Sequence, residues 1–202
     1  MALMPNPPAL SFSEAVADRV QSLLAPPVTS NTLNSALRHL AKWRSELVAN
    51  TVLTRSGAVV QSGPFKGMAY PVRASEGSRV ARLLGAYEAV LHPVIEAIIA
   101  RAPDLVIDIG SAEGYYAVGL ARRLERTRIL ARDADDRAQA LCRSLAEANG
   151  LAERIEVGGL FGHSDFDICA TGRAVVICDI EGGEMRFLTR SQHPASCRLM
   201  CW

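Results

Sequence analysis

The sequence predicts an α/β protein with a doubly wound, mostly parallel sheet and an N-terminal helical extension. Four short apolar runs, each about as long as a buried strand, alternate with segments whose apolar residues recur at helical spacing. Strands that alternate with helices in this way build a parallel sheet with helices packed on it. The four runs are residues 105–107, 128–131, 155–157 and 174–178.

The stretch 105–124, LVIDIGSAEGYYAVGLARRL, joins a strand, a glycine turn and a helix. The apolar run ends at Asp108, and Gly110 and Gly114 frame the turn. Such a turn directs free backbone N–H groups and the positive end of a helix dipole toward a bound ligand. We expect Gly110 to need a positive φ or a close ligand, so that Gly110→Val abolishes binding and leaves the fold largely intact.

The other segments complete the expected fold. The interpretation is an extension and hairpin over residues 1–76 and a ligand-binding domain over residues 77–202. Tyr87 and Glu88 precede the glycine turn and are read either as the mouth of the site or as a core tyrosine with a solvated glutamate. We expect two helices in the extension, over 13–24 and from Asn31-Thr32 to about 48, followed by a hairpin over 58–70. Three further helices are expected from Ser78 to Leu91 with Gly85 inside, from Pro93 to about Arg101, and over 138–148.

An acidic residue follows each of three predicted strands, at Asp108, Asp133 and Asp179. The carboxyl ends of parallel strands lie on one edge of a sheet, which is where ligands bind in open α/β folds. Asp133 follows Gly110 at roughly the ~20-residue interval at which an acid reaches ribose hydroxyls. Asp135 is the alternative for this role, and Asp136 is interpreted as an acid at a helix start.

Composition limits the classes of partner. The chain has 202 residues, of which 49% are hydrophobic and 21% charged, and its net charge is +1. We therefore expect a folded protein with no nucleic-acid partner. We also expect no membrane partner, because no apolar stretch approaches the ~20 residues that span a bilayer. Five irregularly spaced cysteines and an N-terminus without an apolar signal region indicate a reducing, cytoplasmic location.

The glycine spacing distinguishes between two cofactors. The dinucleotide pattern G-x-G-x-x-G would place Gly110, Ala112 and Tyr115 at its glycine positions, and the bulky Tyr115 disfavours NAD. The run Asp108-Ile109-Gly110-Ser111-Ala112-Glu113-Gly114 resembles the first motif of class I S-adenosylmethionine-dependent methyltransferases. Three later runs resemble successive landmarks of the FkbM-like branch of this family: Asp133-Ala134-Asp135, Asn149-Gly150-Leu151 and Asp179-Ile180-Glu181-Gly182-Gly183-Glu184.

The resemblance implies a Rossmann-like methyltransferase fold that binds S-adenosylmethionine and methylates a hydroxyl of a small molecule or glycan. It places Asp108, Gly110 and Gly114 at the methionine end of the cofactor, with Ser111 among the binding residues. It places Asp133 at the ribose and Asp179 beside the sulfonium. The alternatives are an inert cofactor-binding or interaction protein and, less favoured, an NAD-dependent oxidoreductase.

The catalytic base is left open. Asp179, Glu181 and His163 are the main candidates, and Glu184 and His92 are two others. We expect no metal, because the acids after residue 178 could offer oxygen ligands to magnesium but no second segment completes the set.

The chain ends 23 residues after Asp179, so we expect the terminal strands of this fold to be missing and residues 196–202 to form at most a fifth strand. An open edge there predicts a homodimer through the C-terminal segment, or poor solubility.

Overall fold

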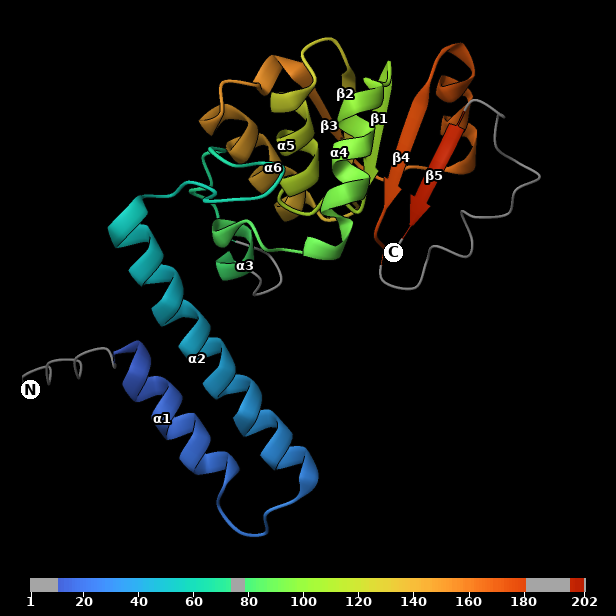
Figure 1. Ribbon diagram of the computed structural model, residues 1–202. Helices are drawn as coiled ribbons and strands as arrows, with labels where there is room; N and C mark the ends of the chain where they lie inside the picture. Colours follow the sequence, from blue (N-terminus) through green and yellow to red (C-terminus); the bar gives the residue numbers. More distant parts are fainter. Residues whose placement is uncertain (1–10, 74–78, 181–196, 202) are drawn as a thin grey trace, which may run out of the picture.

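The computed structural model describes residues 11–73, 79–180 and 197–201. Within them, five strands form one sheet in the order β3-β2-β1-β4-β5, and all four neighbouring pairs are parallel (Figure 1). The predicted α/β class and the parallel sheet are therefore confirmed. The strands are β1 (Leu105–Ile109), β2 (Arg128–Arg132), β3 (Ile155–Gly158), β4 (Ala174–Cys178) and β5 (Cys197–Cys201).

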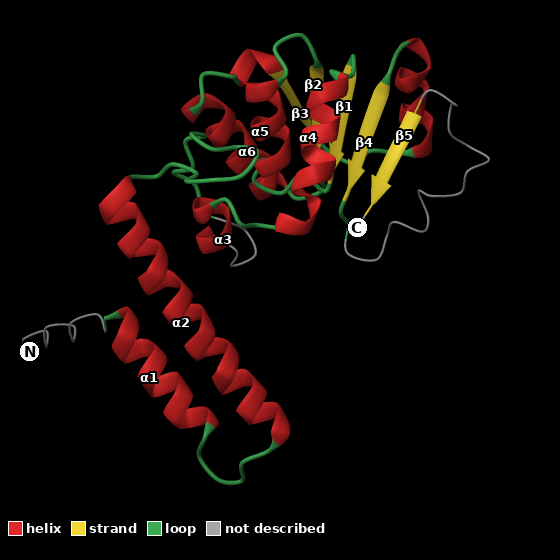
Figure 2. Cartoon of the chain, viewed as in Figure 1, coloured by secondary structure: helices red, strands yellow, loops and turns green. Residues whose placement is uncertain are grey.

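Alternate side chains of the strands enter two separate apolar clusters, one on each face of the sheet. Val106 and Val175 join the larger cluster, which also contains residues of α4 (His92–Arg101), α5 (Tyr115–Arg123) and α6 (Asp136–Ala148). Ile107 and Val176 join the smaller cluster, which includes side chains from the 3₁₀ segment η3 (His163–Thr171). Both faces of the sheet are covered, as a parallel sheet requires (Figure 2).

The hairpin expected over residues 58–70 is present as a single antiparallel bridge between Val59 and Ala69. Its side chains Phe65 and Tyr70 are buried in the larger cluster together with Tyr115 of α5. This segment therefore contributes directly to the core beside the glycine turn.

The N-terminal extension consists of α1 (Phe12–Leu23) and α2 (Ser30–Ser56), which lie side by side and project from the rest of the chain (Figure 1). The expected cap at Asn31-Thr32 is displaced by two residues. Thr29 is the N-cap, and Thr32 occupies the third helical position of a capping box.

The prediction of one long helix from Ser78 to Leu91 is wrong. Ser78 lies outside the described residues, and α3 (Arg79–Leu84) stops before Gly85, which has φ 72°. A Cβ at Gly85 would lie 1.9 Å from the carbonyl oxygen of Ser62 in the hairpin, so there is room only for a glycine at this position. A short 3₁₀ turn, η1 (Ala89–Leu91), then leads into α4, and a second one, η2 (Ala152–Arg154), precedes β3.

None of the helices in the described ranges is both long enough and apolar enough to span a bilayer.

Candidate functional site

The carboxyl ends of β1, β2 and β4 are joined by backbone hydrogen bonds. The N–H of Asp179 donates to the carbonyl of Ile109 at 2.9 Å, and the N–H of Gly110 donates to the carbonyl of Arg132 at 2.8 Å. The chain runs from β1 outward to β3 and then returns to β4 on the other side of β1. A crevice opens at such a reversal, and the three acids predicted from the sequence surround it.

Gly110 has the positive φ expected of it, at 78°. Its close neighbour is protein, because a Cβ at this position would lie 1.8 Å from the carbonyl oxygen of Asp179. The expectation that Gly110→Val leaves the fold intact is therefore wrong, since any side chain here collides with the end of β4. Gly114 is constrained in the same way, with φ 86° and a Cβ position 2.5 Å from the sulfur of Cys142 in α6.

Asp108 is 3% exposed and accepts a hydrogen bond from the N–H of Ala117, in the first turn of α5, at 3.0 Å. Burial raises the pKa of Asp108 to about 7, and the Ala117 hydrogen bond only partly opposes this. The neighbouring acids Asp179, Asp133 and Glu113 raise it further. A group of carboxylates in this arrangement attracts a cation.

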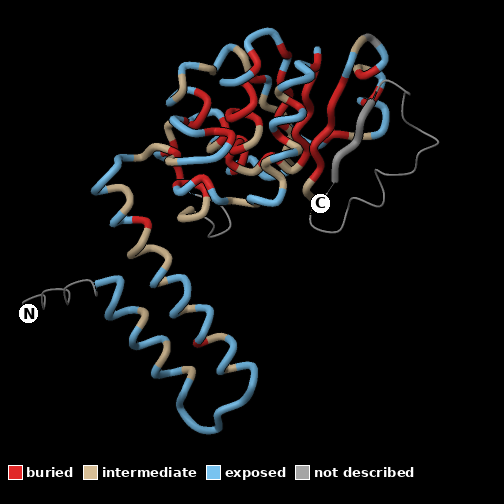
Figure 3. Tube along the Cα trace, in the orientation of Figure 1, coloured by how far each residue is buried: buried red, intermediate tan, exposed pale blue. Residues whose placement is uncertain are grey.

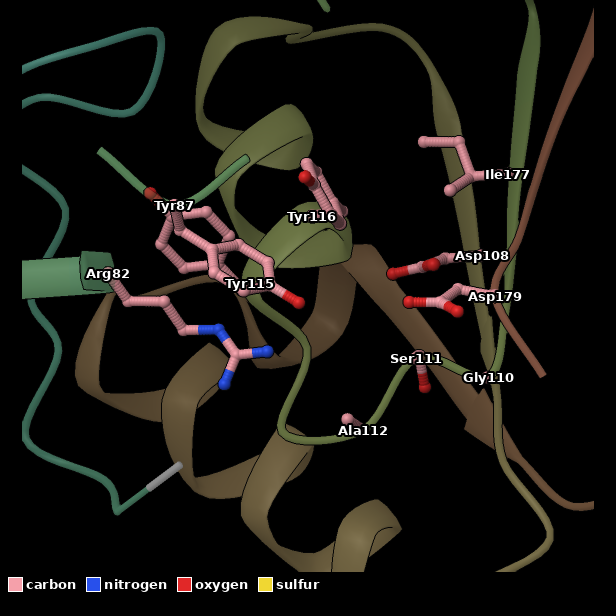
Figure 4. Close-up of a pocket in the computed structure, with 10 residues that line it drawn as sticks. All are labelled: Arg82, Tyr87, Asp108, Gly110, Ser111, Ala112, Tyr115, Tyr116, Ile177 and Asp179. Atoms are coloured by element: carbon pink, nitrogen blue, oxygen red, sulfur yellow. The ribbon is translucent and has the colours of Figure 1, made fainter. Parts of the chain in front are cut away.

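A first cavity, which we call the inner cavity, opens beside the glycine turn. Figure 4 shows Asp108 and Asp179 on one side and the guanidinium of Arg82 with the tyrosine rings on the other. Acidic and basic groups therefore occupy opposite walls. The inner cavity is lined by Arg82, Tyr87, Asp108, Gly110, Ser111, Ala112, Tyr115, Tyr116, Ile177 and Asp179.

Arg82 is held by a buried ion pair. Its Nη1 lies 2.5 Å from Oε1 of Glu113, which also accepts a hydrogen bond from the hydroxyl of Tyr70 at 2.6 Å. The guanidinium carbon lies 4.2 Å from the ring centre of Tyr87, within the range of a cation–π contact. Within the described residues, Nε of Arg82 and Oγ of Ser111 are buried without a hydrogen-bond partner. Both residues line the inner cavity, where a polar ligand would satisfy them.

Tyr87 lines the inner cavity, as the functional interpretation of the segment before the turn requires. The neighbouring Glu88 has φ 45° and accepts a hydrogen bond from the hydroxyl of Tyr116, a second residue of the cavity wall. A left-handed conformation at a residue with a side chain costs free energy and is concentrated at functional sites.

A second cavity, which we call the outer cavity, is more open and lies at the ends of β1 and β2. Most of its wall is apolar, and Asp133 and Asp179 are its acidic groups. It is lined by Ile109, Gly110, Ala112, Arg132, Asp133, Ala134, Leu160, Phe161, Asp179 and Ile180.

The two carboxylate oxygens of Asp133 each accept a backbone hydrogen bond at 2.9 Å, Oδ2 from Ala112 and Oδ1 from Asp135. Each oxygen keeps a further lone pair for a ligand. Asp135, the alternative ribose acid, is the N-cap of α6 and accepts from the N–H of Arg137. Asp136 begins that helix, as expected.

The inner and outer cavities share Gly110, Ala112 and Asp179. Of the three, only Asp179 has a side chain that can exchange a proton. His163 is exposed at the start of η3 and lines neither cavity, and His92, at the start of α4, lines neither as well. Glu181 and Glu184 lie outside the described residues. In the described part of the chain, no group of three His, Cys, Asp or Glu residues could hold a metal ion.

Sequence reasoning missed Arg82, Glu113 and Tyr70. Glu113 occupies a variable position of the turn pattern, and Arg82 lies in a helix that was predicted from its apolar residues. An arginine among apolar helix positions is the one signal that could have drawn attention, because arginine is almost never fully buried without a partner.

No protein-family model matches the chain, and a search of curated proteins gives no match either. Similar solved structures include the O-methyltransferase TomG from Streptomyces achromogenes in complex with SAM, with 17% identity, a TM-score of 0.42 and coverage of 48% of this chain and 46% of that one. An O-methyltransferase from Bacillus cereus in complex with SAH has 14% identity, a TM-score of 0.42 and coverage of 89% and 68%.

A precorrin-6y C5,15-methyltransferase from Geobacter metallireducens has 12% identity, a TM-score of 0.42 and coverage of 55% and 61%. The chain spans about half the length of the Streptomyces protein. None of these similarities establishes a function for this chain.

Proposed function

We propose that this chain binds S-adenosylmethionine and transfers its methyl group to a hydroxyl oxygen of a small molecule or glycan. The observation that carries the proposal is a pair of cavities of different chemistry that meet at Asp179. The cofactor has matching halves, a charged amino-acid end and an adenosine, joined through a sulfonium.

The inner cavity suits the amino-acid end. The carboxylate of Asp108, which lies beside that of Asp179, would hold the ammonium group, while Nε of Arg82 and the hydroxyl of Ser111 offer unpaired donors to the carboxylate. The same acids oppose a dinucleotide, because they would repel the pyrophosphate that a glycine turn otherwise binds. Tyr115, whose ring is buried where a dinucleotide turn has a glycine, supports the same choice.

The outer cavity suits the nucleoside. Asp133 retains lone pairs for the ribose hydroxyls, and the apolar side chains of Leu160, Phe161 and Ile180 would enclose the adenine. The ribose assignment to Asp133 is also favoured over Asp135 because Asp133 lines the outer cavity and Asp135 does not.

The sulfonium would lie where the halves join, beside Asp179. When bound, S-adenosylmethionine supplies an electrophilic methyl group, so the chain's own task is to orient the acceptor and to accept its proton. Among the described residues that line both cavities, Asp179 is the one with a proton-accepting side chain, so it is the proposed base. The acceptor class follows the resemblance of the D-x-E-G-x-E run at 179–184 to the FkbM-like branch.

Isothermal titration of the purified chain with S-adenosylhomocysteine and, separately, with NAD tests the proposal. We expect binding of the former alone, followed by transfer of labelled methyl groups to hydroxylated acceptors. Binding of NAD with no binding of S-adenosylhomocysteine would refute it. Binding of S-adenosylhomocysteine without transfer to any acceptor would favour an inert cofactor-binding protein.

A further inference from the structure

The helices α1 and α2 form a hairpin, here called the arm, which extends away from the sheet and its helices (Figures 1 and 3). It is a built structure, because both helices start in capping boxes and the indole N–H of Trp43 donates to Oγ of Ser13 at 3.0 Å. Two packed helices nevertheless cannot enclose a core. No residue of α1 is buried, and only Ala36 and Ala49 are buried in α2.

The arm carries most of the exposed apolar surface. Of the nine large hydrophobic side chains that are exposed in the described residues, six lie between residues 12 and 40. Scattered single exposures are normal on a protein surface, whereas a concentration of this kind indicates an interface. The six are Phe12, Leu24, Val28, Leu33, Leu37 and Leu40.

Three of these leucines share one face of α2. Leu33, Leu37 and Leu40 are four and three residues apart, which is the spacing of one helix face, and they are 52%, 65% and 43% exposed. Leu47, one heptad after Leu40, continues the row into a shallow groove that is lined by residues of α2 alone. We call this row of four leucines the leucine face.

We propose that the leucine face docks against the arm of a second copy of this chain, so that two arms form a four-helix bundle. Two identical amphipathic hairpins bury their apolar faces on each other in an isologous contact, which closes after two copies. This inference is independent of the methyl-transfer proposal, because none of its residues lines the inner or the outer cavity.

The size of the arm suits a dimer. With 27 residues α2 is about 40 Å long, and at a helix width of about 10 Å its face measures roughly 400 Å². The 12 residues of α1 add roughly 180 Å². Two arms would thus bury at most about 1,160 Å² together, which lies just below the size of standard stable interfaces and suits a weak dimer.

Charge favours a second copy over a membrane surface. Residues 30–45 of α2 include Arg38, Lys42 and Arg44 and no acid, whereas α1 carries two acids, Glu14 and Asp18, against one base. A bundle in which α1 of one copy meets α2 of the other brings these opposite charges together. Anionic lipid headgroups would be attracted to α2 but repelled by the acids of α1.

Sedimentation velocity of the full chain at tens of micromolar tests the proposal. We expect twice the 21.7 kDa mass of one chain, and a monomer for the double variant Leu37→Gln/Leu40→Gln. The matched control is Val90→Gln, which replaces an 86% exposed valine outside the arm and should leave the dimer intact. Circular dichroism checks that each variant keeps its helices.

A monomeric wild-type chain overturns the proposal, and so does a double variant that remains dimeric through another surface, such as the edge at β5. Flotation of a monomeric chain with phosphatidylserine vesicles also overturns it, in favour of a membrane. If the double variant loses helical signal, Leu37→Gln alone decides, with an expected hundredfold weaker dimer. A shift of the dimer constant below threefold then refutes the interface.

Discussion

The carboxylate of Asp133 accepts a hydrogen bond from the backbone N–H of Ala112, with 2.9 Å between Oδ2 and N. The acid at the end of β2 therefore holds the glycine turn that follows β1. This contact links two features that the sequence indicates separately, and it gives Asp133 a structural role in addition to the proposed contact with ribose. A variant of Asp133 should accordingly affect both ligand affinity and the order of the turn.

We expect Asp133→Ala to weaken binding of S-adenosylhomocysteine by about 1.5–3 kcal/mol, the range for hydrogen bonds to a charged group. This corresponds to roughly a 10- to 150-fold loss of affinity in isothermal titration. Asp133→Asn keeps one acceptor oxygen and should lose less.

Asp135→Ala is the control for this prediction, because the two acids are neighbours at the same edge of the sheet. It removes the N-cap of α6 and should cost about 1 kcal/mol of unfolding free energy while leaving affinity unchanged. If Asp135→Ala weakens binding and Asp133→Ala does not, the ribose assignment is wrong.

Gly110→Ala should destabilise the whole fold, because its Cβ would lie 1.8 Å from the carbonyl oxygen of Asp179. Gly150→Ala is matched to it in conformation, with φ 68° against 78°, but has nothing within 4 Å of its Cβ position. Thermal unfolding should show a loss of roughly 1–2 kcal/mol for Gly150→Ala, from the left-handed conformation alone, and a clearly larger loss for Gly110→Ala. Equal losses would contradict the close approach of Gly110 to the end of β4.

The strands and the turn could be predicted because their signals are local. The apolar run at 174–178 matches β4 residue for residue, and Asn149-Gly150 ends α6 with the expected positive φ at Gly150. The acids at the carboxyl ends followed from parallel topology, since Asp108 lies one residue before the end of β1, and Asp133 and Asp179 directly follow β2 and β4. The helix could not be predicted to stop before Gly85, because the close contact that breaks it is with the backbone of Ser62, far away in the sequence.

The place of Arg82 in the wall of the inner cavity could not be predicted either, because it too depends on contacts between residues that are far apart in the sequence. Arg82 and Glu113 are 31 positions apart and belong to elements whose packing no local pattern encodes. The partner of Glu113 on its other side, Tyr70, comes from the hairpin. Sequence patterns identified the edge of the sheet where the proposed ligand site lies, and tertiary packing added the opposite wall.

We expect Glu113→Gln to destabilise the chain by about 3–5 kcal/mol, because it leaves the guanidinium of Arg82 buried without its counter-charge. Burial alone lowers the pKa of Arg82, but Glu113 raises it and the net direction is upward, so arginine cannot lose its proton to escape this cost. Urea unfolding measures the loss.

The double variant Arg82→Met/Glu113→Leu removes both charges and should recover part of the stability. A double variant no more stable than Glu113→Gln would show that packing around Tyr70 and Tyr87, and not the unpaired charge, causes the loss.

The raised pKa of Asp108 makes the stability of the ligand-free protein depend on pH. The folded protein keeps the proton of this buried carboxyl up to about pH 7, whereas the unfolded chain releases it near its ordinary pKa of 3.8. The folded state therefore binds more protons between these values, and the contribution of Asp108 is complete below about pH 4 and is lost as the pH rises to about 7. Asp108→Asn can still accept from Ala117, and its unfolding free energy should fall less between pH 5 and pH 8 than that of the wild type.

The affinity for the ligand should depend on pH in the opposite direction to the stability of the ligand-free protein. The ammonium group of S-adenosylhomocysteine favours the ionised form of Asp108, so binding in the inner cavity should expel its proton. Between pH 5 and pH 7.5 we therefore expect the affinity to rise with pH and then to level off, and titrations in two buffers of different ionisation enthalpy should show a proton released at pH 6. Asp108→Asn should bind more weakly at pH 8 and lose most of the pH dependence. Unchanged proton release in that variant would assign the titrating group to another acid of the cluster, such as Asp179.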